Sequence, residues 1–365
     1  MTALAIASPD RQVYSQTFIH QQIANLPFDI HLLYGGNLPT HRAAGADSVG
    51  YRFPGENADP WVRVRAMADY LNEHRVEAVL AQFGPCGVEM MPVCAVAKVP
   101  LLVHFHGYDA WRKEVLASYG TRYRALFEQA HAVIAVSREM HDHLAAMGAH
   151  TARLHHVPYG VDTELFTGAQ PAVSGRDFLI VGRQVEKKGH LLVLLAFAEL
   201  LKFVPDCSLR IIGSGALRES GEMLVRALGI SDHVRWLGVL SPQDVARELQ
   251  SSRALIQFSQ ITPSGDREGT PVAMLEAMSS GVPVIGTRHA GIPDVIQDEV
   301  HGLLVDPFDQ AGLTRALRRL ATDPELAGRL GRASATLVHT RYNRKRYLDE
   351  LTALIHTALP NPDIH

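Results

Sequence analysis

Short apolar runs alternate with longer amphipathic stretches along the whole chain of 365 residues. This alternation is typical of parallel βαβ units, in which a crossover helix joins each strand to the next. The runs are too short for membrane spans or long core helices, so we interpret them as strands. Strands are predicted at 4–7, 29–34, 78–82, 101–105, 132–136, 154–157, 177–181, 208–212, 234–237, 254–257, 284–287 and 302–305.

The stretches between these runs are predicted helices, and the chain is long enough for two domains. Segment 167–175 is small, polar and contains glycine and proline, as a linker does. We therefore predict an α/β fold of two Rossmann-like, doubly wound domains, 1–166 and 176–340, with an interdomain cleft. Ligands of such sheets bind beyond the carboxyl ends of the strands. Helices are expected at 17–25, 60–74, 119–129, 138–147, 189–203, 219–228, 242–250 and 271–280.

Composition excludes several classes of function. A formal net charge of −3 gives no reason to expect nucleic-acid binding. The 19 histidines show no metal-ligand spacing, and the three cysteines are too far apart for a metal cluster or a disulfide framework. The N-terminus has no basic region followed by an apolar core, so it is expected to be a first strand rather than a signal peptide. These features predict a cytoplasmic protein without a membrane span.

Two glutamates, Glu268 and Glu276, flank a predicted helix start. Thr270 is a suitable N-cap, Pro271 suits the first helical position, and Gly281 suits the helix end. The free amides of such a start bind phosphate. Glu276 is the only charged residue in 269–287, and an unpaired buried carboxylate is costly. The combination predicts a sugar-nucleotide pocket, although a solvated loop acid and a structural ion pair would give the same two residues.

A basic loop follows the predicted strand 177–181. Gly182 can form a tight turn at the strand end, and Arg183 and Lys188 precede the next predicted helix. Two cations directed at one point would suit a diphosphate. A solvated basic loop is the alternative interpretation.

These motifs together resemble glycosyltransferase family 4, a family of retaining enzymes with the GT-B fold, and in particular its hexosyltransferases of bacterial exopolysaccharide and lipopolysaccharide synthesis. The resemblance covers nearly the whole chain, and the second half carries its most specific part, Glu-x7-Glu with the upstream arginine and lysine. The matching motifs are Gly182-Arg183, Lys188-Gly189, Gly213-Ser214-Gly215, Trp236-Leu237-Gly238, Glu268 with Glu276, Gly281-Val282-Pro283, His104-Phe105-His106-Gly107-Tyr108-Asp109 and Pro158-Tyr159-Gly160-Val161-Asp162.

The resemblance implies catalytic roles for four residues. Glu268 would hold the donor hexose through its 3-hydroxyl, and Arg183 and Lys188 would neutralise the departing nucleoside diphosphate, so that no metal or other cofactor is needed. His106 would approach the C6 side of the hexose from the other domain. The alternative interpretation is that His106 has a structural role only, as a histidine at a strand end whose hydrogen bonds are made within the protein.

The resemblance also implies donor contacts. Glu276 would accept hydrogen bonds from both ribose hydroxyls, since a carboxylate has paired acceptors. Leu237 and Gly238 would line the base pocket through their backbone. The other donor-binding residues expected are Gly182, Gly269, Thr270 and Pro271.

Four residues of the first half are expected on the acceptor side, namely Ser15, Gln16, Tyr108 and Asp109. Gln16 stands where the polysaccharide-building members of this family usually have a glutamate, and its neutral amide cannot serve as a base or pair with a cation. The last helix, 341–359, is expected to cross back onto the first domain, as in the GT-B fold.

The predicted activity is transfer of a hexose, with retention, from a nucleoside-diphosphate sugar to a glycan, glycolipid or other hydroxyl acceptor. UDP is the expected nucleotide by resemblance, and the oligomeric state is open. The basic and aromatic residues of 111–124 fit a solvated helix, or peripheral contact with the inner face of the cytoplasmic membrane. Three alternatives stay open: a non-catalytic sugar-nucleotide-binding protein, a GT-B-fold sugar-nucleotide epimerase, and an oxidoreductase, for which Gly213-Ser214-Gly215 is an incomplete dinucleotide fingerprint.

Overall fold

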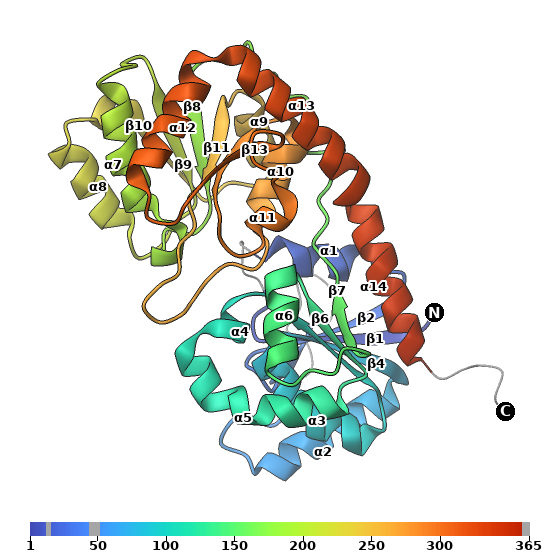
Figure 1. The fold of residues 1–365 in the computed structure, drawn as a ribbon. Coiled ribbons are helices and arrows are strands. Elements are labelled where there is room, and N and C mark those ends of the chain that lie inside the picture. Colours follow the sequence, from blue (N-terminus) through green and yellow to red (C-terminus); the bar gives the residue numbers. More distant parts are fainter. Residues whose placement is uncertain (12–15, 44–51, 360–365) are drawn as a thin grey trace. The chain divides into compact units, whose positions relative to one another are not determined.

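The computed structural model describes residues 1–11, 16–43 and 52–359 (Figure 1). The chain divides into two compact units, the first comprising Met1–Pro158 with Tyr347–His365 and the second comprising Tyr159–Arg346. Both units are α/β, as predicted.

The first unit contains a sheet in the order β3-β2-β1-β4-β5-β6-β7. Its pairs are parallel except β2 with β3, which is antiparallel. The strands are β1 (Ala3–Ser8), β2 (Asp29–Tyr34), β3 (His41–Arg42), β4 (Val76–Gln82), β5 (Leu101–Phe105), β6 (Ala132–Ala135) and β7 (Leu154–His156). The helices are α1 (Thr17–Asn25), α2 (Pro60–Glu73), α3 (Gly84–Ala97), α4 (Tyr108–Trp111), α5 (Lys113–Gln129), α6 (Arg138–Ala146) and, entering this unit at Tyr347, α14 (Arg344–Ala358).

The second unit contains a fully parallel sheet in the order β10-β9-β8-β11-β12-β13. The sequence-adjacent strands run outward in both directions from the centre, so the order reverses between β8 and β11. The strands are β8 (Asp177–Val181), β9 (Ser208–Ile212), β10 (Val234–Gly238), β11 (Ala254–Gln257), β12 (Val284–Thr287) and β13 (Gly302–Val305). The helices are α7 (His190–Leu201), α8 (Arg218–Ala227), α9 (Pro242–Gln250), α10 (Val272–Ser280), α11 (Ile292–Val295), α12 (Gln310–Thr322) and α13 (Pro324–Arg341), with short 3-10 turns at Glu186–Lys188 and Ser231–His233.

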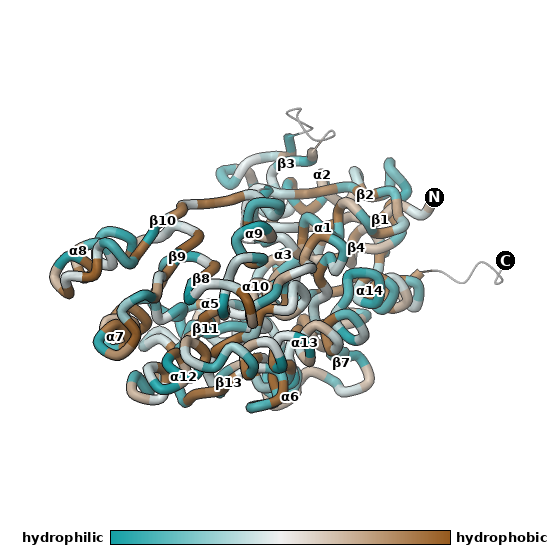
Figure 2. Tube along the Cα trace, turned by 90° about the horizontal axis from the view of Figure 1, so that it is seen from above, coloured by the Kyte–Doolittle hydropathy of each residue, from teal (hydrophilic) through white to brown (hydrophobic). Residues whose placement is uncertain are grey.

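Apolar strands buried on both faces explain why the strand prediction succeeds. Every residue of β1, β5 and β11 is buried, as expected for parallel strands covered by helices on both sides. In the second unit Phe178 and Phe197 join one continuous core, to which the apolar helix α7 (brown in Figure 2) contributes. All the predicted strands are present, and the short β3 was not predicted.

Helix α3 is one of the helices absent from the predicted set, together with α4, α11, α12 and α13. It begins with Gly84-Pro85-Cys86-Gly87 and contains Pro92, a composition typical of turns. The glycines are needed for packing, because a Cβ on Gly84 would lie 2.4 Å from the Phe105 ring and one on Gly87 would lie 2.7 Å from Val103. Close packing on the sheet therefore outweighs weak helix propensity here.

The unit boundaries differ from the predicted ones at 166 and 341. Segment 159–166 belongs to the second unit because it is bonded there. The amide of Val161 donates to Tyr342 O, the amide of Arg344 donates to Val161 O, and Arg344 pairs with Asp162 at 2.7 Å. The C-terminal segment enters the first unit at Tyr347 rather than at 341. The interdomain cleft stays a prediction.

Candidate functional site

The two loops predicted to bind the donor follow neighbouring strands of the second sheet. Gly182 to Gly189 follow β8, and the segment with Glu268 follows β11, so both loops begin where the strand order reverses. A reversal of strand order opens a crevice at the carboxyl edge of an open α/β sheet, which is the usual ligand position.

Glycines allow the turns at this edge to pack closely. Gly182 has a φ of +151°, and a Cβ there would meet the side chain of Lys188 at 3.3 Å. A Cβ on Gly213 would lie 2.1 Å from Gly182 O, and one on Gly215 would lie 2.5 Å from Gln184 O. Backbone packing between the turns after β8 and β9 therefore explains Gly213 and Gly215 without a dinucleotide.

Lys188 and Glu268 form an ion pair at the reversal point. Their Nζ and Oε1 atoms are 2.9 Å apart, and the two side chains are only 14% and 10% exposed. Burial by itself would raise the pKa of Glu268, but the cations of Lys188, Lys187 and Arg183 outweigh it and lower the pKa to about 2. Glu268 is therefore an ionised acceptor at neutral pH.

A second ion pair, which sequence reasoning missed, joins the same two loops. Lys187 Nζ lies 2.9 Å from Asp266 Oδ1 and donates to Arg267 O at 3.2 Å. The Lys187 side chain is 8% exposed. The only signal in the sequence is that each loop carries a second residue of the same charge close to the predicted one, Lys187 beside Lys188 and Asp266 near Glu268. This pair holds the Glu268 loop against the Lys188 loop.

Arg183 is exposed, and within the described residues its guanidinium forms no hydrogen bond or ion pair. Its charge contributes to lowering the pKa of Glu268, so it lies near the ion pair. The structure thus brings three of the four predicted charged site residues of the second unit, Arg183, Lys188 and Glu268, to one place.

Helix α10 begins beside this cluster. Its N-cap is Pro271, with no side-chain cap hydrogen bond, so the predicted N-cap Thr270 is wrong by one position. Gly269, Thr270 and Pro271 are buried, and Gly269 O accepts from the amide of Gly291 at 3.0 Å. The helix ends at Gly281 in the left-handed conformation, as predicted.

Glu276 lies on α10 and is 8% exposed. Within the described part of the chain its carboxylate has no hydrogen-bond or ion-pair partner, although the sequence argument expected one. Burial raises its pKa to about 7. A buried carboxylate with no protein partner retains its full capacity to accept ligand hydroxyls.

Leu237 and Gly238 end β10 at the edge of the sheet. Gly238 has a φ of +69°, and its carbonyl accepts from the amide of Gly213 at 2.7 Å. Both residues are half-buried. Their predicted contact with the base stays a prediction.

In the first unit, His106 follows β5 and is 8% exposed. Its Nε2 lies 2.8 Å from Gln82 Oε1, and its ring lies 4.5 Å from Phe18 and 4.7 Å from Phe83. Burial and the neighbouring His104 hold the pKa of His106 well below its usual range. His106 is therefore neutral at physiological pH.

Asp109 is held by backbone amides in the first unit. Its carboxylate is fully buried and accepts from the amides of Gly84 at 3.0 Å, His106 at 3.1 Å and Gly107 at 2.8 Å. It therefore shapes the loop that carries His106, and its assignment to the acceptor side stays a prediction. Tyr108 is half-buried, with its ring 5.2 Å from Phe83.

Gln16 is the N-cap of α1 and makes no side-chain cap hydrogen bond. It is half-buried. Ser15 lies outside the described residues. Contact of either residue with an acceptor stays a prediction.

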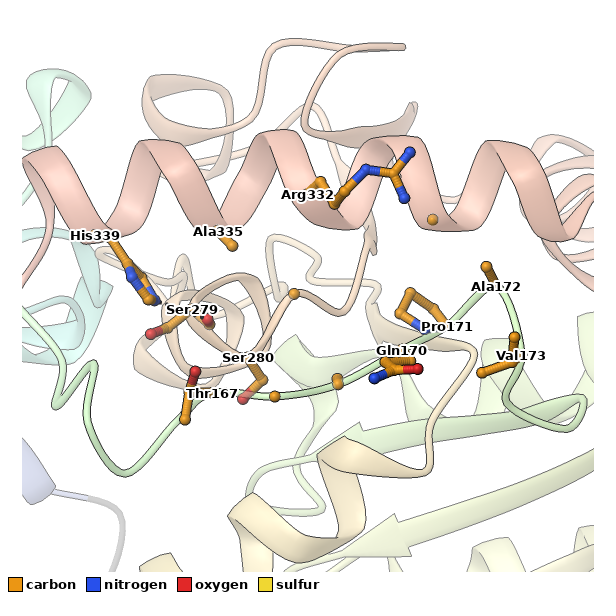
Figure 3. A pocket seen from close by; sticks show the side chains of 14 residues that line it. Thr167, Gln170, Pro171, Ala172, Val173, Ser279, Ser280, Arg332, Ala335 and His339 are labelled. Carbon is orange, nitrogen blue, oxygen red and sulfur yellow. Dashed lines mark hydrogen bonds between the residues drawn. The ribbon is translucent and has the colours of Figure 1, made fainter.

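A cavity of about 390 Å³ lies at the opposite end of α10, next to Gly281. Figure 3 shows Arg332 and His339 of α13 on one side and the segment 167–173 on the other. His339 Nε2 lies 3.0 Å from Ser279 O, so part of the lining is already hydrogen-bonded. None of the predicted site residues lines this cavity.

The described residues contain no group of three or more histidine, cysteine or acidic side chains that could hold a metal ion. In the same part of the chain no helix combines the length and the apolar character that crossing a membrane requires.

Comparison with known proteins assigns the family. The model described as Glycosyltransferase Family 4 matches residues 19–165, and the model described as Glycosyl transferases group 1 matches residues 164–336. The two matches follow one another along the chain and cover most of both units. The chain belongs to glycosyltransferase family 4 and is a glycosyltransferase.

Individual relatives agree with this assignment. WcaL of Escherichia coli (strain K12), named for colanic acid biosynthesis, is 29% identical over 77% of this chain and 70% of its own length. The amylovoran biosynthesis glycosyltransferase AmsK of Erwinia amylovora is 30% identical over 66% of this chain and 60% of its own. A GDP-mannose-dependent alpha-(1-6)-phosphatidylinositol monomannoside mannosyltransferase of Mycolicibacterium smegmatis is 28% identical over 75% of this chain and 74% of its own.

The fold agrees with that of solved glycosyltransferases. The sucrose-phosphate synthase of Thermosynechococcus elongatus superposes with a TM-score of 0.80 at 19% identity, over 98% of this chain and 99% of that one. The predicted GT-B fold, two Rossmann-like α/β domains, is thereby confirmed.

Proposed function

We propose that this glycosyltransferase moves a hexose, with retention and without a metal, from a nucleoside-diphosphate sugar to a glycan or lipid-linked acceptor in polysaccharide or glycoconjugate biosynthesis. The observation that carries the proposal is the buried carboxylate of Glu276, which has no partner among the residues that the structure describes. It lies on the helix that starts beside the Lys188–Glu268 pair. A buried carboxylate without a partner is costly unless a ligand uses it. Two adjacent ribose hydroxyls match its paired acceptor atoms.

The charged cluster suits the diphosphate of such a donor. Lys188 and Arg183 would stabilise the charge that grows as the nucleoside diphosphate departs, and the amides of Val272 and Ala273 at the start of α10 would add donors to the distal phosphate. Pro271 has no N–H and so shapes the turn. Glu268, ionised and fixed by Lys188, would accept a hydroxyl of the hexose.

The reaction we propose is a front-face displacement. The acceptor oxygen forms a bond to the anomeric carbon as the bond from that carbon to the leaving phosphate oxygen breaks. The phosphate oxygen takes the acceptor proton, so no protein nucleophile is consumed. A covalent glycosyl-enzyme trapped with a slow substrate would contradict this scheme.

The nucleotide has two candidates. UDP follows from the family resemblance of the sequence. GDP-mannose follows from the M. smegmatis relative, whose name states that donor.

The names of AmsK and of the same relative support a polysaccharide or phospholipid-linked glycan as acceptor. For a lipid-linked acceptor we propose that the chain works at the cytoplasmic membrane surface, with Arg122 and Arg124 of α5 facing anionic lipid.

A thermal-shift panel of UDP, GDP, ADP and NAD tests the proposal. A ligand at about a hundred times its Kd adds roughly 2.7 kcal/mol of stability. We expect UDP or GDP to raise the Tm and NAD to leave it unchanged, and the larger shift identifies the base. A shift with NAD alone would favour an oxidoreductase. A UDP or GDP shift without sugar transfer to any acceptor would favour the sugar-nucleotide-binding protein, and release of an epimerised sugar would favour the epimerase.

A further inference from the structure

A continuous chain of buried polar side chains leads away from His106 inside the first unit. Gln82 is the last residue of β4, Gln22 lies on α1 and Tyr347 lies on α14. All three side chains are fully buried. They come from segments far apart in the sequence and share no spacing pattern.

Each link of the chain has a defined donor and acceptor. His106 Nε2 lies 2.8 Å from Gln82 Oε1, Gln82 Nε2 donates to Gln22 Oε1 at 2.7 Å, and Gln22 Nε2 donates to Tyr347 Oη at 2.6 Å. The same Gln22 amide lies 3.4 Å from Nδ1 of the buried His104. An amide oxygen only accepts, so this order places the proton of the neutral His106 ring on Nε2 and leaves Nδ1 with the lone pair.

The donor and acceptor directions of these hydrogen bonds can reverse only together. Turning over the Gln82 amide alone would bring its oxygen against Gln22 Oε1, which is unfavourable in a buried site. The chain stays paired only if Gln22 also turns over and Tyr347 becomes a donor. That reversed order would direct Gln82 Nε2 at His106 Nε2 and move the His106 proton to Nδ1.

We propose that Gln82, Gln22 and Tyr347 are positioning residues that fix the tautomer and the ring orientation of His106. The reason for such hydrogen bonds rests on the proposed function together with the role that the family resemblance implies for His106. In that role His106 contacts the transferred hexose and must present one defined nitrogen to it. The chain is neutral throughout, so it fixes the ring without introducing a charge. A ring held in the wrong tautomer would present a donor in place of an acceptor.

Tyr347→Phe tests the proposal with minimal change of shape. The variant removes the hydroxyl that accepts from Gln22 Nε2, so a buried Gln22 N–H is left poorly paired. If both glutamine amides turn over, the group left poorly paired is the side-chain carbonyl oxygen of Gln22 instead. Unpaired buried N–H groups are the rarer of the two in proteins. The variant should therefore shift His106 toward the Nδ1–H tautomer.

Tyr70→Phe is the matched control. Tyr70 is also a buried tyrosine of the first unit, and its hydroxyl lies 2.7 Å from His31 Nδ1. It is not one of the residues hydrogen-bonded in series from His106 to Tyr347. Both variants remove a buried hydroxyl that pairs with another side chain. A change seen only in Tyr347→Phe therefore reports on the chain and not on general loss of stability.

The primary measurement is a long-range 1H–15N spectrum of protein labelled with 15N-histidine, with His106 assigned by its loss in His106→Gln. Wild type and Tyr70→Phe should show His106 as Nε2–H, and Tyr347→Phe should show Nδ1–H or a mixture. An unchanged His106 signal in Tyr347→Phe, or an Nδ1–H signal in wild type, overturns the proposal.

Kinetics give the second readout. Transfer by Tyr347→Phe should fall roughly ten- to a hundred-fold through misplacement of His106, at unchanged nucleoside-diphosphate affinity. Tyr70→Phe should transfer at the wild-type rate. An equal loss of transfer in both variants would overturn the proposal. If the spectra behave as predicted but wild type transfers no sugar, the proposed function fails and the positioning chain stands.

Discussion

The two units hold their candidate site residues by different physical means. The second unit uses charge, with two ion pairs across two loops and one buried carboxylate that has no partner among the described residues. The first unit uses a neutral chain of two amides, a phenol and an imidazole around His106. The charged cluster suits a ligand whose charge changes during reaction, whereas the neutral chain suits a group that must stay fixed and uncharged.

The contrast extends to the acidic residues. In the second unit, cations lower the pKa of Glu268 and burial raises that of Glu276. In the first unit, three backbone amides occupy the buried carboxylate of Asp109. A buried carboxylate whose acceptor atoms are taken up by backbone amides, as in Asp109, therefore does not by itself mark a ligand site.

Lys188→Ala should give the largest effect. If Lys188 stabilises the departing diphosphate, transfer should fall roughly 10²- to 10³-fold, more than donor affinity falls. Steady-state kinetics with calorimetric donor affinity measures both. Lys202→Ala is the control, since Lys202 forms an exposed ion pair with Glu199 at 2.7 Å and should leave both values unchanged. Equal losses of rate and affinity would show that Lys188 acts only in binding.

Acid stability should report the Glu268 pair. Its pKa in the folded state, about 2, lies below the ordinary value of 4.5, so its stabilisation is present above about pH 4.5 and is lost as the pH falls towards 2. At 1.36 kcal/mol per pKa unit this amounts to roughly 3 kcal/mol. Urea unfolding between pH 5 and 3 should show a steeper loss for wild type than for Glu268→Gln. An equal loss of unfolding free energy with falling pH in both proteins would show that Glu268 does not form an ionised pair.

Glu276→Gln should change the pH dependence of nucleotide binding. The ribose hydroxyls need the ionised carboxylate, so affinity of wild type should rise with pH through about 7, by up to ten-fold per unit below that value. The glutamine variant should bind at least ten-fold more weakly at pH 8 and lack this dependence. Calorimetric titration at pH 6, 7 and 8 measures it. A wild-type affinity independent of pH beyond the nucleotide's own titration would contradict the role.

The raised pKa of Glu276 also has a stability consequence of opposite sign to that of Glu268. Without ligand, its contribution is present below about pH 4.5 and is lost as the pH rises through about 7. Saturating nucleotide should remove this loss, because it stabilises the ionised form. The same unfolding series with and without nucleotide tests this.

The Lys187–Asp266 pair should give the smallest effect. A double-mutant cycle with Lys187→Met and Asp266→Asn should show a coupling of about 1–2 kcal/mol in unfolding free energy, because the pair is more buried than an ordinary surface pair. Transfer should fall a few-fold in each single variant through loosening of the Glu268 loop. Additive changes would show that the two side chains act independently.

Much of the fold and of the charged site was predictable from sequence. The strands are buried on both faces and form clear apolar runs, and Lys188, Glu268 and Glu276 stand out as charges beside glycines or within apolar segments. The helix α3 was missed because its glycines satisfy close packing against Phe105 and Val103, which only the tertiary structure shows. The pairing of Lys187 with Asp266 was missed because only the tertiary structure brings the two loops together.

The neutral chain of the first unit could not be predicted. Gln22, Gln82 and Tyr347 are common residue types, and 325 positions separate the first from the last. Their meaning arises only from burial and from the direction of each hydrogen bond. Asp109, in contrast, was noticed as part of a motif, but its three amide partners come from the loop conformation.

The most direct test of the account is a crystal structure of the protein with UDP or GDP bound. We predict the diphosphate at Arg183, Lys188 and the first amides of α10, with both ribose hydroxyls within hydrogen-bond distance of Glu276. A nucleotide bound elsewhere, with Glu276 still unpartnered, would contradict the account.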